Sequence, residues 1–313
     1  MLGKDLVSIA DLSADDIAQV LDLAAELKAQ RHPRTRPLRG RVLALVFQKP
    51  SLRTRVSFEV GMQQLGGHAL YLSNQEIRLG EREEIPDAAR VLSRMVDGIV
   101  ARTYFHEHVV ELAGAASVPV INGLSDAEHP CQVLADLLTM RERRGRLAGL
   151  KLAWVGDGNN VVNSLLLAAP RAGLNLCIAT PPRYEPDGAR LAAAADEAAE
   201  AGVELEATSD PRVAVRGADF VYTDVWYSMG QEDEREARLP LFRPYQVNTT
   251  LLAEADPGAG VLHCLPAHRG EEIAGDILDG PASLVLDQAE NRLHVQKALL
   301  LRLMQDQGSR MKN

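Results

Sequence analysis

At 313 residues, with 46% hydrophobic and 25% charged residues, the chain is long enough for two domains with substantial buried cores. Its net charge of −9 and its pI near 5.4 argue against nucleic acid as a general partner, because backbone phosphates favour an extended basic face. The three cysteines form no C-x-x-C pair, so we expect a reducing, cytoplasmic compartment. We expect neither a secretory leader nor a membrane span.

The chain alternates helical segments with short apolar ones, beginning with an N-capped amphipathic helix in "LSADDIAQVLDLAAELKAQ". An alanine-rich stretch, "ARLAAAADEAAEAG", predicts a surface helix. The segments predicted as strands are "VLALVF", "HALYL", "GIVAR" and "VPVING", then "LKLAWVG", "LNLCIA", "DFVYTD", "GVLHC" and "SLVLD". Because alternating strands and helices form parallel sheets with helices on both faces, the sequence predicts an α/β fold with two such sheets.

The segment "HPCQVLADLLTMRERRGRLAG" separates the two groups of strands, and its leucines fall at helical spacing before a basic stretch with glycines. We place the domain boundary there, with a first domain over residues 1–145 and a second over 146–285. Residues 286–313 contain a long amphipathic helix, "DQAENRLHVQKALLLRLMQ". We expect this helix to pack back on the first domain.

A strand, a turn and a helix follow one another in "VLALVF", "QKPSLRTR" and "VSFEVGMQQLGG". The turn lies at a helix N-terminus, where free backbone N–H groups and the helix dipole favour an anion. Ser51 and Thr54 add hydroxyl donors, and Arg53 adds a planar guanidinium. Alone, such residues more often cap a helix or face solvent, but ligands of parallel sheets bind where strands end, as here. The sequence therefore predicts a phosphate site in this turn.

The stretch "FQKPSLRTRVSFE" resembles the carbamoyl-phosphate signature of the aspartate/ornithine carbamoyltransferase family, F-x-K-x-S-T-R-T-R-x-S-F-E. Five further blocks occur in the order and approximate spacing of its ornithine enzymes: "EHPCQVLADLLT", "GDGNNVVNSLL", "DVWYSMGQEDE", "HCLPAHRGEE" and "DQAENRLH". The resemblance implies two Rossmann-like α/β domains, an active site in the cleft between them, and assembly as a trimer or a multiple of trimers. It implies transfer of the carbamoyl group of carbamoyl phosphate to the δ-amine of L-ornithine, giving L-citrulline and phosphate, in arginine metabolism without metal or organic cofactor.

The same resemblance assigns residues to each substrate. For carbamoyl phosphate they are Ser51, Leu52, Arg53, Thr54, Arg102, His129, Gln132, Cys264, Leu265 and Arg292, and for ornithine they are Asn160, Asp224, Ser228 and Met229. The catalytic groups among them are Arg53, Arg102, His129, Asp224 and Cys264, with Asp224 and Cys264 set to tune the loss of the amine's proton. Taken singly, each has a structural alternative, such as an arginine paired on the surface or an aspartate capping a turn.

Two motifs invite other chemistry. "WVGDGNNVVNSLL" resembles a dinucleotide-binding turn but lacks the third glycine of G-x-G-x-x-G, and its amides suit an amino acid better than a pyrophosphate. In "HCLPAHRGEE", His263, Cys264 and His268 suggest zinc, but we expect no metal, because adjacent strand residues point to opposite faces and no second Cys/His cluster completes the set.

Two positions depart from the family pattern: Leu52 replaces the usual threonine, and Arg78 stands in a loop where glutamine is common. Three alternative functions stay open from the sequence. The first is a sister carbamoyltransferase acting on aspartate, putrescine or an acylated ornithine. The others are a nucleotide-dependent oxidoreductase and a non-catalytic module that senses phosphate compounds.

Overall fold

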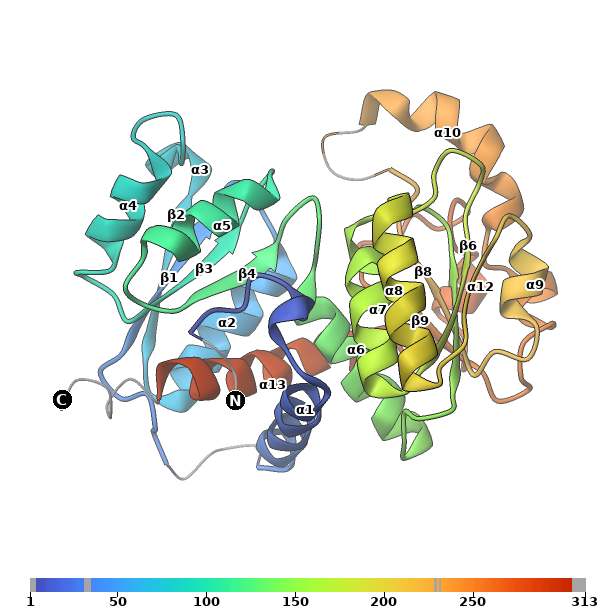
Figure 1. The fold of residues 1–313 in the computed structure, drawn as a ribbon, viewed down its shortest axis with the longest axis horizontal. Helices are drawn as coiled ribbons and strands as arrows, with labels where there is room; N and C mark the ends of the chain where they lie inside the picture. The colour runs from blue at the N-terminus through green and yellow to red at the C-terminus, as the bar shows by residue number, and fades with distance from the viewer. Residues whose placement is uncertain (1–3, 31–34, 228–229, 231, 306–313) are drawn as a thin grey trace. The chain divides into compact units, whose positions relative to one another are not determined.

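A computed structural model describes residues 4–30, 35–227, 230 and 232–305 and shows alternating helices and strands (Figure 1). The chain divides into two compact units, Met1–Leu138 with Glu290–Asn313, and Thr139–Ala289. Each unit contains one sheet whose strands pair in parallel. The predicted α/β fold with two parallel sheets is confirmed. Two helices cross the division along the chain, α6 (Pro130–Arg144) and α13 (Val285–Met304).

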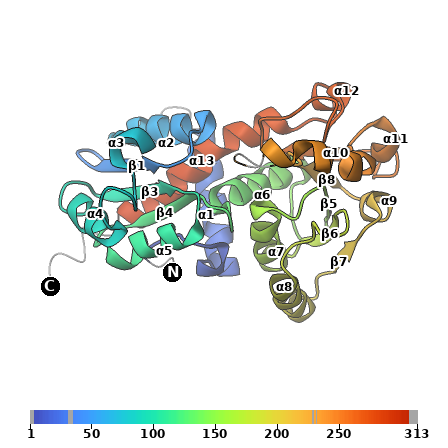
Figure 2. The same cartoon turned by 90° about the horizontal axis from the view of Figure 1, so that it is seen from above.

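The first unit is built on a four-stranded sheet in the order β2-β1-β3-β4. Residues Leu43 to Phe47 of β1 are at most 1% exposed, as expected for a central strand covered on both faces. Figure 2 shows α2 and α13 on one face of this sheet and α4 and α5 on the other. Its elements are η1 (Ile9–Asp11), α1 (Ala14–Ala29), β1 (Val42–Phe47), α2 (Leu52–Leu65), β2 (His68–Ser73), α3 (Asn74–Ile77), α4 (Ile85–Leu92), β3 (Gly98–Arg102), α5 (His106–Ala115) and β4 (Val120–Leu124).

Helix α2 starts and stops where the sequence indicates. The Ser51 hydroxyl accepts a hydrogen bond from the Thr54 N–H, which caps the first turn. Phe58, Met62 and Leu65 are fully buried on one face. At the other end, Gly66 ends the helix with a φ of 89°, a conformation that favours glycine. The turn that precedes α2 is therefore held at a defined position after β1.

The second unit has a five-stranded sheet in the order β7-β6-β5-β8-β9. Helices α7 and α8 pack together on one face, and α9, α11 and α12 contribute to the hydrophobic core on the other (Figure 2). Its elements are β5 (Lys151–Val155), α7 (Asn160–Ala172), β6 (Asn175–Ala179), α8 (Gly188–Ala201), β7 (Leu205–Thr208), α9 (Pro211–Val215), β8 (Phe220–Thr223), η2 (Glu232–Glu234), α10 (Arg235–Phe242), η3 (Arg243–Tyr245), α11 (Thr249–Leu252), β9 (Gly260–His263) and α12 (Gly275–Leu278).

One predicted strand of the second unit is wrong. In "SLVLD", Ser283 makes only an isolated bridge to Val261, and α13 begins at Val285. The fifth strand is β7, an edge strand with the sequence "LEAT" whose residues are at least partly exposed, so it lacks an apolar run. The alanine-rich segment does form a surface helix, α8, with Ala194 and Ala198 as its buried residues. Among the described helices, none has the length and apolar character needed to cross a bilayer.

Candidate active site

The turn after β1 carries hydroxyl and guanidinium groups close to a second helix of the first unit. Thr54 is fully buried, and its hydroxyl accepts a hydrogen bond of 2.6 Å from Nη2 of Arg292, which lies on α13. Arg53 lies beside Thr54 in the first turn of α2, while Leu52 is 75% exposed. The first turn of α2 and Arg292 therefore meet at one place, although 238 residues separate Thr54 from Arg292.

Three arginines lie near enough to His129 for their positive charges to act on it. Arg102 is the last residue of β3, and His129 immediately precedes α6, so both stand at ends of elements, where side chains are available to a ligand. Burial lowers the pKa of His129 well below its usual value, and the positive charges of Arg292, Arg102 and Arg53 lower it further. The imidazole is therefore neutral near pH 7. This part of the first unit therefore combines cations with a neutral hydrogen-bonding group.

The neutrality of His129 has a measurable consequence for stability. The lowered pKa means that the unfolded chain binds a proton below about pH 6.5 that the folded chain does not, so stability is present above this pH and is lost as the pH falls. Lowering the pH from about 7.5 to about 5.5 should therefore lower the free energy of unfolding through this group. His129→Gln should lack this loss, whereas a variant of the exposed His68 should retain it; urea midpoints at both pH values measure the difference.

Gln132 lies in the first turn of α6, three residues after His129. Its Nε2 donates to Asp136 at 2.8 Å, and its Oε1 takes no part in that contact. This oxygen is buried and makes no hydrogen bond to any described residue. A buried amide oxygen without a donor is costly, which makes it a fitting acceptor for a ligand N–H group.

In the second unit, Asp224 collects donors from three segments. Its carboxylate accepts from Asn159 Nδ2 at 2.7 Å, from the Cys264 thiol at 2.9 Å and from the Val225 N–H at 2.8 Å. Asp224 follows β8 and is 6% exposed, and Cys264 follows β9, so both stand at carboxyl ends of neighbouring strands. These contacts fix the carboxylate and place the thiol against it.

The backbone after β9 has an unusual conformation held by a buried histidine. Leu265 has a φ of 60°, and its N–H donates to His263 Nδ1 at 2.9 Å. Since Nδ1 accepts, Nε2 carries the proton and donates to Glu272 at 3.1 Å; both side chains are fully buried. A non-glycine residue at positive φ persists only when its surroundings hold it. His263 and Glu272 supply that support.

The geometric argument against a metal needs correction. Strand β9 ends at His263, so Cys264 is not constrained to the opposite face, and ligand atoms of Asp224, His263 and Cys264 lie within 4.8 Å of one another. Both ring nitrogens of His263 are already engaged by Leu265 and Glu272, however, so a metal would displace the contacts that hold the turn. His268 belongs to a different group, with Glu271 and Glu272.

The comparisons with known proteins agree with this arrangement. Residues 4–142 match the family model for the carbamoyl-P binding domain of aspartate/ornithine carbamoyltransferase, and residues 148–303 match that for its Asp/Orn binding domain. The chain belongs to the aspartate/ornithine carbamoyltransferase family. The expected resemblance is therefore confirmed, and the nucleotide-dependent oxidoreductase loses its support.

Within this family the chain is similar along its whole length to ornithine carbamoyltransferases. It is 54% identical over 304 residues to the ornithine carbamoyltransferase of Carboxydothermus hydrogenoformans, with 96% of this chain and 98% of the relative covered. The anabolic ornithine carbamoyltransferase of Pyrococcus furiosus is 52% identical, with 97% of both chains covered. Among solved structures, ornithine carbamoyltransferase from Pyrococcus furiosus superposes with a TM-score of 0.94 at 52% identity, over 96% of this chain and 97% of that one. That from Thermus thermophilus gives 0.89 at 50% identity, over 97% and 100%.

The glycine turn of this family member is explained by packing. Gly158 donates its N–H to the Tyr184 carbonyl, and a Cβ at Gly158 would lie about 2.5 Å from the backbone of residues 184–186. The turn thus uses glycine for a close backbone approach and needs no pyrophosphate to account for it. Asn159 caps α7 and holds Asp224, a role that the sequence analysis missed; the second asparagine of "GNN", Asn160, begins α7. Ser228 and Met229 lie outside the described residues.

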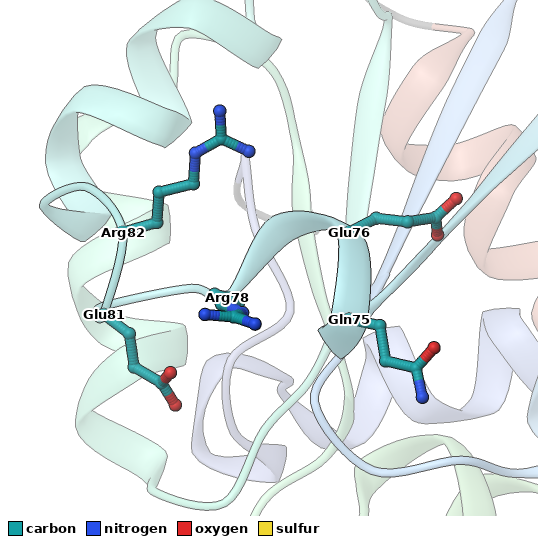
Figure 3. Close-up of a pocket in the computed structure, with 5 residues that line it drawn as sticks. All are labelled: Gln75, Glu76, Arg78, Glu81 and Arg82. Carbon is teal, nitrogen blue, oxygen red and sulfur yellow. The ribbon is translucent and has the colours of Figure 1, made fainter.

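The segment after β2 lines a separate pocket in the first unit, formed by Gln75, Glu76, Arg78, Glu81 and Arg82 (Figure 3). Arg78 ends α3 with a φ of 41°, and its carbonyl accepts from the N–H groups of Glu81 and Arg82. Two arginines therefore alternate with acidic side chains here. This mixed charge differs from the cationic surroundings of His129.

Proposed function

We propose that this chain is an ornithine carbamoyltransferase, which transfers the carbamoyl group of carbamoyl phosphate to the δ-amine of L-ornithine and releases L-citrulline and phosphate. The observation that carries the proposal is that the charges of Arg53, Arg102 and Arg292 all act on a neutral His129, and that Arg292 donates to Thr54 in the first turn of α2. Carbamoyl phosphate has a dianionic end and a neutral polar end, and this group of residues offers partners for both. The similarity to ornithine carbamoyltransferases along the whole chain supports the choice of reaction.

The phosphoryl end is assigned to Ser51, Arg53, Thr54 and Arg292, with the backbone N–H of Leu52. Donation through the backbone explains why leucine is accepted at position 52, where its side chain is exposed. Arg102 and His129 hold the carbamoyl oxygen, and the buried Oε1 of Gln132 accepts from the carbamoyl N–H group. The cations stabilise charge that grows on oxygen during transfer.

The amino-acid substrate is assigned to the second unit. Asn160, Ser228 and Met229 hold the α-amino-acid end, and Asp224 attracts the side-chain ammonium. An ammonium has no lone pair, so the δ-amine must lose one proton before it attacks. Asp224 and Cys264, whose side chains contact one another, tune that loss. The backbone of Cys264 and Leu265 also borders the carbamoyl group in this assignment.

The chemical step joins the amine nitrogen to the carbamoyl carbon. The amine lone pair forms the C–N bond, the bond from the carbamoyl carbon to the bridging oxygen breaks, and phosphate leaves with that electron pair. The nitrogen then loses its second proton. Most of the rate enhancement comes from positioning and electrostatics, without metal, organic cofactor or covalent intermediate. A trapped carbamoyl-cysteine would contradict this mechanism.

The proposal also covers setting and assembly. We place the enzyme in the cytoplasm and in arginine biosynthesis, and we infer a homotrimer or a multiple of trimers. Three free cysteines suit a reducing compartment. Exposed apolar side chains of α2 and β2 suit a contact between subunits; they are Leu52, Val56 and Leu70.

A substrate panel tests the function. With carbamoyl phosphate present, the chain should form citrulline from ornithine at a kcat/KM at least about 100-fold above that for putrescine, N-acetylornithine or aspartate, because a site built to pair a charged group rejects analogues that lack it. Colorimetric detection of the ureido product compares all four acceptors. Faster turnover of any of the other three would identify a sister carbamoyltransferase, and no product at high enzyme concentration would favour a binding module.

A further inference from the structure

The N-terminal segment, residues 4–11, runs alongside β4 and adds hydrogen bonds to it. The Leu6 N–H donates to the Val120 carbonyl, and the Asn122 N–H donates to the Leu6 carbonyl, so Leu6 pairs with Ile121 like a short additional strand. Asp5 accepts from the Val120 N–H at 2.8 Å. This segment, which we call the N-terminal strap, therefore has a fixed register along the edge of the first sheet.

The strap then reaches the turn that follows β4. Glu128 is 2% exposed, and its carboxylate accepts from the Ser8 hydroxyl and from the Ile9 N–H at 3.0 Å. Ser8 also caps η1, and the Ser8 N–H donates to Asp11, so the donors facing Glu128 are held in place. A buried carboxylate thus receives two donors from a segment almost 120 residues away in sequence.

The turn itself is closed on the other side. The Ser125 N–H donates to the Glu128 carbonyl at 2.9 Å, and the Glu128 N–H donates to the Ser125 hydroxyl at 3.2 Å. His106 Nδ1 lies 2.8 Å from the same hydroxyl. Glu128 is therefore fixed through both its backbone and its side chain, and the next residue along the chain is His129.

We propose that Glu128 is a positioning residue for carbamoyl transfer: held by Ser8 and Ile9 of the N-terminal strap, it sets the place of His129 at the carbamoyl end of the substrate. This inference rests on the proposed function, in which His129 contacts the carbamoyl group and not the phosphoryl group. His129 is neutral and 4% exposed, so it acts through hydrogen-bond geometry, which is sensitive to small displacements. The strap thereby becomes part of the substrate site without contacting the substrate.

A carboxylate suits this place because the Ser8 hydroxyl and the Ile9 N–H both donate to it. In Glu128→Gln, the amide oxygen replaces one acceptor, but the NH₂ group then faces a donor, either the Ile9 N–H or the Ser8 hydroxyl. The hydroxyl can rotate to accept, and the backbone N–H cannot. The amide is therefore expected to shift the turn rather than abolish it, which keeps the variant folded. Ser8→Ala is milder still, because the Ile9 N–H remains.

The experiment compares Glu128→Gln, Ser8→Ala and Asp5→Ala with the parent in the citrulline assay. For Glu128→Gln, kcat/KM for carbamoyl phosphate should fall about tenfold, while KM for ornithine and the inhibition constant of inorganic phosphate stay within about twofold. Ser8→Ala should show a fall of about threefold with the same pattern. Asp5→Ala removes a strap contact at the start of β4, away from the turn. It should therefore lower Tm but leave kcat/KM for carbamoyl phosphate unchanged relative to the inhibition constant of inorganic phosphate.

The phosphate measurement separates positioning from general loosening of the fold. The proposal would be overturned if Glu128→Gln lowered kcat/KM for carbamoyl phosphate and the affinity for inorganic phosphate by the same factor. It would also be overturned if kcat/KM for carbamoyl phosphate stayed at the parental value. Should Glu128→Gln fail to fold, Ser8→Ala decides on the same criterion. A parent enzyme that produces no citrulline would instead refute the proposed function, which is a different result from variants that match an active parent.

Discussion

Arg53→Ala is expected to lower kcat/KM for carbamoyl phosphate about 10²–10³-fold, the usual effect of removing one donor to developing charge, worth about 2.7–4 kcal/mol of barrier. Arg53 stands in the first turn of α2, between the capping Ser51 and the buried Thr54, where the backbone already favours an anion. Its charge also contributes to lowering the pKa of His129. Steady-state citrulline formation at varied carbamoyl phosphate measures the loss.

The chain offers a matched control two residues away. Arg55 pairs with Glu59 at 2.9 Å, and its guanidinium lies 3.9 Å from the centre of the Tyr71 ring. Because Arg55 is exposed, these contacts lie on the surface of the protein. Arg55→Ala should therefore change kcat/KM by less than about threefold, since exposed pairs contribute little. Arg53→Lys should recover only part of the parental rate, because an ammonium cannot reproduce the planar fork. Equal effects of the two alanine variants would show that the phosphate site has been misplaced.

Much of the fold follows from local signals in the sequence. The unit of β1, turn and α2 is predictable because an apolar run, a capping serine and a C-terminal glycine all specify the same boundaries. Edge strand β7 cannot be predicted in this way, because an edge strand needs no apolar run. Its pairing with β6 is decided by the tertiary structure. The misassigned "SLVLD" shows the converse: an apolar run of strand length forms the start of a buried helix.

The candidate site likewise has residues that local sequence indicates and residues that it does not. Single residues with evident chemistry, such as Arg53 and His129, can be proposed from motifs. Contacts between distant segments are not, because neither Arg292 to Thr54 nor Glu128 to the N-terminal strap leaves a pattern in local sequence. The role of Asn159 is hidden for the same reason: its side chain contacts Asp224, which lies 65 residues away. Residues that hold other residues in place therefore emerge only from the three-dimensional contacts.

Asp224→Asn is expected to lower kcat/KM for ornithine about 10²–10⁴-fold, in the range typical of lost proton-transfer catalysis. The substitution keeps the size of the side chain but removes the negative charge that we propose attracts the ammonium group. It also turns one acceptor into a donor, which would face either Asn159 Nδ2 or the Cys264 thiol, so the contact on that side is lost as well. Initial rates at varied ornithine, with carbamoyl phosphate saturating, give the value.

Asp224→Asn should affect the use of ornithine and leave the binding of phosphate nearly unchanged. Because Asp224 lies in the second unit and contacts groups of that unit, the inhibition constant of inorganic phosphate should remain within about twofold of the parent. Asp279→Asn serves as the matched control, since Asp279 forms an exposed pair with Arg269 and should tolerate the change. If Asp224→Asn weakened the binding of phosphate as strongly as that of ornithine, the carboxylate would be a structural support of the whole enzyme, and another group would have to tune the loss of the amine's proton.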